Sequence, residues 1–123
     1  MRLAFRCLFY GAITAVFVGS LLPVSQVEPI FVLKDWLIHF AAYAFCGLLA
    51  AYGFKSPANK SRAFVGLFTT GAIIEVVQPY VGRHFDWFDL SANSMGILAA
   101  ILGRVVLKQI VALIFKRETS ESA

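Results

Sequence analysis

Polar groups able to do chemistry are concentrated in residues 82–93, GRHFDWFDLSAN, which lie between two apolar stretches. This segment holds an arginine, a histidine, two aspartates and an asparagine. Upstream, Asp35 and His39 are four residues apart, and Glu75 and Gln78 are three apart. Side chains at these spacings share one face of a helix. The pattern therefore predicts a polar cluster to which more than one helix contributes.

The groups in this cluster suit the binding of a polar headgroup. Carboxylates and amides form hydrogen bonds, an imidazole can act as acid or base, and a guanidinium can hold a phosphate or a carboxylate. The candidate ligand-binding residues are Asp35, His39, Glu75, Gln78, Arg83, Asp86, Asp89 and Asn93. If the cluster is catalytic, the candidates are His39, Glu75 and Asp89.

Other kinds of site are weakly indicated. Ser91 and Ser94 have no base at a spacing that would activate them as nucleophiles. One histidine with several carboxylates can hold a divalent ion, but a HExxH-type spacing is absent, so we expect no metal and no cofactor. Cys7 and Cys46 lie in apolar runs without a CxxC spacing, and we expect both to be small buried hydrophobic residues.

The composition of the 123-residue chain indicates a membrane protein. Hydrophobic residues make up 59% and charged residues 15%, and the mean hydropathy is +0.77. A soluble domain of this size could not bury so much apolar surface, so the bilayer is the expected solvent. The net charge of +4 does not indicate nucleic-acid binding, because the basic residues lie at the ends of apolar segments rather than in a stripe.

Four apolar runs have the length of about 20 residues that a helix needs to cross a bilayer. They cover residues 3–22, 35–54, 63–81 and 89–106. We predict an all-α membrane protein of one domain, 1–123, with four transmembrane helices in a compact bundle. Residues 107–123 form an interfacial or cytoplasmic tail, and 107–115 either extend the fourth span or lie in the interface as an amphipathic helix.

The first run has a second reading as a signal peptide. Its apolar part is long for one, and no small-x-small cleavage site follows, so a retained span is favoured.

Charge bias predicts the orientation. Seven basic residues lie on one side, in the N-terminus, the loop between the second and third spans and the C-terminal tail: Arg2, Arg6, Lys55, Lys60, Arg62, Lys116 and Arg117. The other side has only Lys34 and Arg83. By the positive-inside rule, both termini are cytoplasmic and the candidate site faces outward. Five of the seven acids then lie at the outer face, in the loops or in the outer part of a span: Glu28, Asp35, Glu75, Asp86 and Asp89.

Burial depth predicts that the ionisable groups face one another. His39 lies about 6 Å inside the second span, at ~1.5 Å per residue, and Glu75 is similarly deep in the third. An ionisable side chain exposed to lipid at that depth costs on the order of 1–3 kcal/mol. His39 and Glu75 should therefore point into the bundle, toward each other.

Several roles stay open. Asp35, Asp86 and Asp89 could act as helix caps or first-turn acids. The acid that orients the imidazole of His39 could be Asp35 or an aspartate of the fourth span.

Glu75 is either neutral and hydrogen-bonded, or paired with Arg83, or a functional carboxylate. Gln78 and Asn93 are read more readily as hydrogen-bonding residues between helices than as ligands.

The ordered motifs in DWLIHFAAYAFCGLL and GAIIEVVQPYVGRHFDWFDLSANSMGILAA resemble the VanZ-like family of small bacterial membrane proteins. The resemblance covers about residues 35–103 and rests on Asp35, His39, Phe40, Glu75, Gln78, Arg83, Asp86, Asp89, Asn93 and Gly96. It implies a cell-envelope protein of the bacterial inner membrane, and it implies an effect on sensitivity to the glycopeptide teicoplanin.

Three functions are compatible with these features. The first is binding of a lipid or envelope-precursor headgroup in an outward-facing polar pocket. The second is enzymatic action on a lipid-linked phosphate or glycan. The third is a structural role, as the helical partner of a larger membrane complex or in a homo-oligomer. The small residues Gly11, Ala15 and Gly19 of the first span permit a helix contact of that kind.

Overall fold

The computed structural model describes residues 1–22 and 34–121, with side chains described as far as Arg117. Over these residues the regular structure is helical: α1 (Arg2–Ser20), α3 (Asp35–Gly53), α4 (Pro57–Val77), the 3₁₀ helix η1 (Gln78–Val81) and α5 (Trp87–Glu121). Four helical segments there, with η1 continuing α4, are long and apolar enough to cross a membrane. The chain is therefore an all-α, multi-pass membrane protein, as predicted. Glu28 lies outside the described residues.

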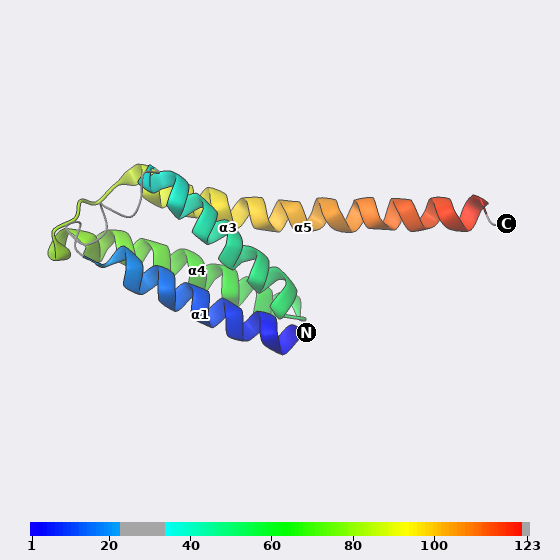
Figure 1. Cartoon of the computed structure of the whole chain (residues 1–123), viewed down its shortest axis with the longest axis horizontal. Coiled ribbons are helices and arrows are strands. Elements are labelled where there is room, and N and C mark those ends of the chain that lie inside the picture. Colours follow the sequence, from blue (N-terminus) through cyan, green and yellow to red (C-terminus); the bar gives the residue numbers. More distant parts are fainter. Residues whose placement is uncertain (23–33, 122–123) are drawn as a thin grey trace.

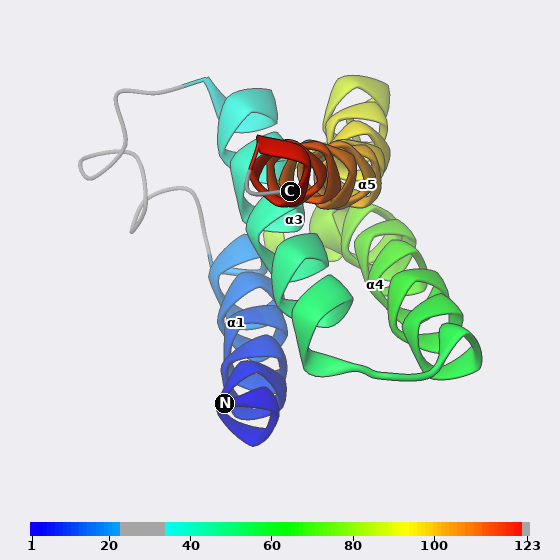
Figure 2. The ribbon, with the colours of Figure 1, turned by 90° about the vertical axis from the view of Figure 1, so that its right-hand side faces the viewer.

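Helix α3 lies at the centre of the helix cluster. It packs most extensively against α5 and next most against α1, while α4 also contacts α5 and α3. Figure 2 shows α3 between α1 and α5, with α4 beside them. The start of α1 and the loop from α3 to α4 lie at one end of this cluster, and the start of α5 lies at the other (Figure 1). The polar residues belong to this second end.

Local capping chemistry sets the start of α4. The sequence places the third span at residues 63–81, but α4 begins at Pro57 because Ser56 caps it: the Ser56 hydroxyl accepts a hydrogen bond from the Asn59 amide at 3.2 Å. Proline is favoured at the first helical position, where its missing N–H is not needed. At the far end Gly82 adopts φ +80°, a left-handed conformation that ends η1 and that glycine adopts readily.

Helix α5 is longer than predicted. The fourth span was expected at 89–106 with two alternatives for 107–115, and the structure shows one uninterrupted helix to Glu121. No glycine or proline follows Gly103, so nothing in the sequence ends the helix. Its 35 residues extend about 52 Å, more than the ~30 Å hydrocarbon layer. Figure 1 shows the C-terminal half projecting beyond the other helices, so only the N-terminal half belongs to the compact bundle.

Small residues let the backbones of α3 and α5 approach closely. A Cβ added at Gly47 would lie 2.7 Å from the Cβ of Ala100. A Cβ added at Gly96 would lie 2.5 Å from the carbonyl oxygen of Phe40. In contrast, an added Cβ would meet nothing within 4 Å at Gly11 or Gly19 of α1. That stripe makes no close helix contact within the described chain.

The end of the cluster opposite the polar residues is held by α1 and α3. The Arg6 guanidinium donates a hydrogen bond to the Gly53 carbonyl at 3.0 Å and lies over the Phe54 ring at 5.5 Å. Of the two cysteines, Cys46 is buried as predicted, but Cys7 is exposed on the protein surface, so the prediction for Cys7 was wrong. In a bilayer this face of α1 meets lipid, where a thiol is tolerated.

Candidate functional site

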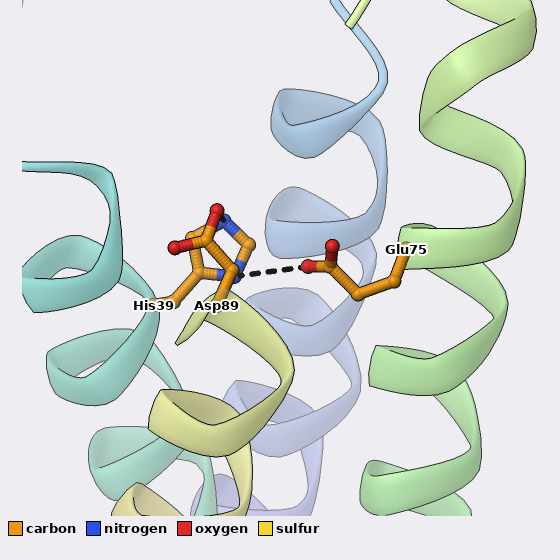
Figure 3. A group of neighbouring side chains, drawn as sticks. All are labelled: His39, Glu75 and Asp89. Atoms are coloured by element: carbon orange, nitrogen blue, oxygen red, sulfur yellow. Dashed lines mark ion pairs between the residues drawn. The ribbon is translucent and has the colours of Figure 1, made fainter. Parts of the chain in front are cut away.

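Three ionisable side chains from three helices meet near the start of α5. His39 comes from α3, Glu75 from α4 and Asp89 from α5, and all three are buried. His39 Nδ1 lies 3.8 Å from Glu75 Oε1, and His39 Nε2 lies 3.8 Å from Asp89 Oδ2. Figure 3 shows the Glu75 carboxylate reaching from α4 toward the imidazole, with the Asp89 carboxylate beside the ring. The prediction that His39 and Glu75 face each other inside the bundle is confirmed.

An asparagine fixes the orientation of the imidazole. His39 Nδ1 lies 3.0 Å from Asn93 Oδ1, and this hydrogen bond is buried. Because an amide oxygen only accepts, Nδ1 carries the proton and donates. Nε2, the other ring nitrogen, faces Asp89. The candidates for orienting the imidazole were Asp35 and an aspartate of the fourth span; Asp89 lies beside the ring, whereas Asp35 pairs with Arg83.

The backbone preceding α5 holds Glu75 in place. Glu75 Oε2 accepts a hydrogen bond from the Asp86 amide at 3.2 Å, which links α4 to the loop before α5. The other carboxylate oxygen, Oε1, is buried without a hydrogen-bond partner among the described residues. This oxygen is the one aimed at His39. Glu75 therefore has hydrogen-bonding capacity that the protein does not use.

A second group of unsatisfied polar atoms lies one helical turn deeper. Among the described residues, Asn93 Nδ2 and Tyr43 OH are buried and lack a partner. Both face the same glycine: a Cβ added at Gly71 would lie 3.1 Å from each of these two atoms. Tyr43 was not among the candidate site residues predicted from the sequence. Its four-residue spacing from His39 was the available signal that it belongs to the site.

Arg83 pairs with Asp35, not with Glu75. Arg83 Nη2 lies 3.4 Å from Asp35 Oδ2, and the Asp35 side chain is 63% exposed. The suggested Glu75–Arg83 pair is therefore wrong, because the turn at Gly82 directs Arg83 toward the start of α3. Asp35 is the first residue of α3 rather than its cap, since the N-cap residue is Lys34. This ion pair lies outside the buried cluster.

Gln78 also lies apart from the cluster. It is buried, and its Nε2 donates to the Ser20 carbonyl at 3.3 Å, which joins η1 to the end of α1. The structure thus gives Gln78 a helix-connecting role, as the sequence favoured. Asn93 differs, because it belongs to the cluster itself.

The two aspartates of the 82–93 segment have different roles. Asp86 Oδ1 accepts a hydrogen bond from the Phe88 amide at 2.7 Å and caps α5. A capping role was one of the two roles expected from the sequence. Asp89 lies in the first turn of α5 and is 6% exposed. A carboxylate near a helix N-terminus is stabilised by the helix dipole. This location offsets part of the cost of burying Asp89 beside Glu75.

The donor set is also one that metal ions use. One ring nitrogen of His39 and one oxygen each of Glu75 and Asp89 all lie within 4.8 Å of one another. The expectation of no metal rested on the absence of ligand spacing along one helix. Ligands from three separate helices produce no such spacing. The geometry therefore brings together a donor set for a metal ion that the sequence spacing could not have indicated.

The chain matches no family model, no curated protein and no solved structure.

Proposed function

We propose that this membrane protein binds a hydroxyl-rich headgroup of a lipid or lipid-linked envelope precursor at the cluster of His39, Glu75, Asp89 and Asn93. The observation that carries the proposal is the set of buried, unpartnered atoms there: Glu75 Oε1, Asn93 Nδ2 and Tyr43 OH. A buried polar atom without a partner costs about 1–3 kcal/mol. In a purely structural cluster these unpaired atoms only destabilise the fold. In a binding site the ligand forms hydrogen bonds to them and removes the destabilisation.

The charge around the cluster favours hydroxyl groups over a free anion. Glu75, Asp86 and Asp89 lie close together, and the nearest guanidinium, Arg83, is already paired with Asp35. Sugar hydroxyls donate to carboxylates and accept from an amide, so they match both kinds of unpartnered atom.

The distribution of basic residues supports an outward-facing site in a bacterial inner membrane. With both termini cytoplasmic, the loop at 82–86 is extracytoplasmic. Cysteine labelling tests this in a Cys7→Ser background, with His84→Cys as the reporter, since His84 is exposed. A membrane-impermeant maleimide should label His84→Cys in intact cells. Labelling only after the membrane is permeabilised would refute the orientation.

The resemblance to the VanZ-like family extends the proposal to the cell envelope. On this reading the protein lowers sensitivity to teicoplanin by engaging an envelope precursor. Expression in a susceptible host should raise the inhibitory concentration of teicoplanin, and Glu75→Gln should abolish the increase. An unchanged inhibitory concentration with well-folded, membrane-inserted protein would remove the resistance role and leave headgroup binding to be judged by its own assay.

Native mass spectrometry of the protein in nanodiscs tests headgroup binding. A glucosyl-diacylglycerol should be retained in preference to phosphatidylglycerol with the same acyl chains. Glu75→Gln and Asn93→Leu should each weaken retention about tenfold, since each lost hydrogen bond to a ligand is worth about 1.4 kcal/mol. Asp35→Asn is the matched control, because Asp35 lies outside the cluster. Equal retention of both lipids by all variants would refute the proposal.

A second candidate is an enzyme acting on a lipid-linked phosphate or glycan. It is favoured by one observation: His39 Nδ1 is occupied by Asn93, which leaves Nε2 beside Asp89 as an acid–base group. Turnover of a labelled lipid-linked substrate that is lost in His39→Ala would establish it.

A third candidate is a structural role in a membrane complex. It predicts that Glu75→Gln and His39→Ala lower thermal stability and activity together. Loss of lipid retention at unchanged stability would exclude it.

A further inference from the structure

We propose that His39, Glu75 and Asp89 bind one divalent cation of the class that accepts mixed nitrogen and oxygen ligands, such as Zn²⁺ or Mn²⁺. This site goes beyond the headgroup proposal and is tested separately from it. The three donor groups come from α3, α4 and α5, and their ligand atoms lie within 4.8 Å of one another. Imidazole nitrogen with carboxylate oxygen suits these metals, whereas Mg²⁺ and Ca²⁺ prefer oxygen alone.

The contact between His39 and Asp89 indicates that a positive charge belongs between them. Since Nδ1 donates to Asn93, the neutral imidazole presents a lone pair at Nε2. Asp89 Oδ2, another acceptor, lies 3.8 Å from Nε2. Two buried acceptors this close are repulsive unless a proton or a metal ion lies between them. A cation coordinated by both atoms resolves the contact.

The second carboxylate has a free oxygen beside the same ring, 3.8 Å from Nδ1 and within the 4.8 Å donor set. Glu75 Oε1 is fully buried, has no hydrogen-bond partner among the described residues, and points toward the imidazole. Its carboxylate is oriented from behind, because Oε2 accepts from the Asp86 amide. An unpartnered oxygen on a fixed carboxylate is the arrangement that a metal ligand requires.

Groups around the donors match the surroundings that metal sites use. A metal-bound histidine almost always donates its other ring N–H to a carbonyl or carboxylate, which fixes the tautomer. The bond from His39 Nδ1–H to Asn93 Oδ1 does this. The Asp86 amide does the same for Glu75. Asn93 is thus a positioning residue for the proposed metal site.

Charge balance also favours a dication. Two ionised carboxylates and a neutral imidazole carry a charge of −2, which one divalent ion cancels. A protonated imidazole would cancel only half of it. Because the surroundings are apolar and the side chains of all three residues are at most 8% exposed, the uncompensated charge is costly.

Side-chain rotation must bring the three donor atoms closer together to hold an ion. Ligand atoms bound at about 2.1 Å around a tetrahedral ion lie about 3.4 Å apart. The His39–Asp89 separation of 3.8 Å would shorten by about 0.4 Å, and a separation at the 4.8 Å limit of the donor set by about 1.4 Å, which rotation of the Glu75 and Asp89 side chains must supply. Three protein ligands leave a coordination position open, as in catalytic zinc sites. A headgroup hydroxyl can occupy that position, so ion and headgroup are compatible.

The test uses the full chain in nanodiscs, with the affinity tag removed and adventitious metal stripped by a chelator. Isothermal titration with ZnCl₂ should show saturable binding of one Zn²⁺ per chain, and titration with MgCl₂ should show weaker binding. X-ray absorption at the zinc edge of the unmodified protein should show nitrogen and oxygen ligands at about 2.0–2.1 Å. Sulfur in the coordination shell, or the absence of saturable binding, would overturn the proposal.

Variants locate the ion. Glu75→Gln, Asp89→Asn and His39→Gln should each weaken Zn²⁺ binding at least about 100-fold, and Asn93→Ala about 10–100-fold as a positioning residue. Asp35→Asn is the control and should keep the affinity of the unmodified chain. Circular dichroism checks that each variant is folded. If a variant is not folded, the X-ray absorption spectrum of the unmodified protein shows whether nitrogen and oxygen ligands hold the ion. Zn²⁺ binding that survives all three ligand substitutions would place the ion elsewhere and overturn the proposal.

Discussion

Replacing Gly96 by alanine tests whether the close contact of α3 with α5 holds the site in place. Gly96 lies one turn after Asn93 and faces α3. The added Cβ would lie 2.5 Å from the Phe40 carbonyl oxygen and 2.8 Å from the Ala44 amide nitrogen. Both are backbone atoms, so no side chain can rotate away. The helices must separate or shift for the methyl group to fit.

The size of the shift follows from the contact distance. Ordinary contacts of a Cβ begin at 3.4 Å, so the 2.5 Å contact requires a displacement of about 0.9 Å. If α5 moves away by that amount, the bond from His39 Nδ1 to Asn93 Oδ1 lengthens from 3.0 Å to about 3.9 Å, beyond hydrogen-bond range. Overpacking of this kind costs about 1–3 kcal/mol. We therefore expect Gly96→Ala to lower stability and to release the imidazole together.

Two measurements on one sample follow both effects. Unfolding by SDS in mixed micelles, monitored by circular dichroism, gives the change in stability. Nitrogen-15 NMR of the two histidines reports the His39 tautomer, with exposed His84 as the internal reference. Gly103→Ala is the matched control on the same helix, because a Cβ there meets nothing within 4 Å. If Gly96→Ala is as stable as Gly103→Ala and keeps the His39 tautomer, the packing argument is wrong.

Three smaller predictions use the same unfolding assay. Gly71→Ala should cost about 1 kcal/mol, because its Cβ lies 3.1 Å from both Asn93 Nδ2 and Tyr43 OH; stability equal to the unmodified chain would mean that the space beside Gly71 is larger than the structure shows. Asp86→Ala should cost about 1 kcal/mol by removing the cap on the Phe88 amide, while Asp86→Asn should restore most of it; equal losses would show that the charge matters rather than the cap. Arg83→Gln should change stability by less than about 1 kcal/mol, since its partner carboxylate on Asp35 is 63% exposed and the ion pair is screened by solvent; a larger loss would place Arg83 in the cluster.

Hydropathy made α1 and α3 predictable, but it missed the start of α4, which Ser56 caps, and the length of α5. Helices α1 and α3 begin and end within two residues of the apolar runs. Helix α5 exceeds its predicted span because hydropathy reports the thickness of a membrane rather than the length of a helix. The predicted span ended at residue 106, before Lys108, but lysine is a good helix former and the helix continues through it.

The cost of ionisable groups in lipid made the convergence of His39 and Glu75 predictable. The individual partners were not, because they depend on how each helix is rotated and how far it slides along its neighbour. Several acids near Arg83 in the sequence were possible partners. The turn at Gly82 directs Arg83 toward Asp35. Asn93 was expected to connect helices, and only the close packing at Gly96 brings it to His39.

The meeting of His39 with Glu75 across two helices is the contact on which every proposal here depends, and a double-mutant cycle measures it most directly. The free energies of unfolding of His39→Ala, Glu75→Gln and the double variant should give a coupling of about 0.5–3 kcal/mol, as expected for residues in one network. His39→Ala combined with Thr14→Ala is the control, since Thr14 is exposed on α1 and bonds only to its own helix. A His39–Glu75 coupling no larger than that of the control pair would contradict the account.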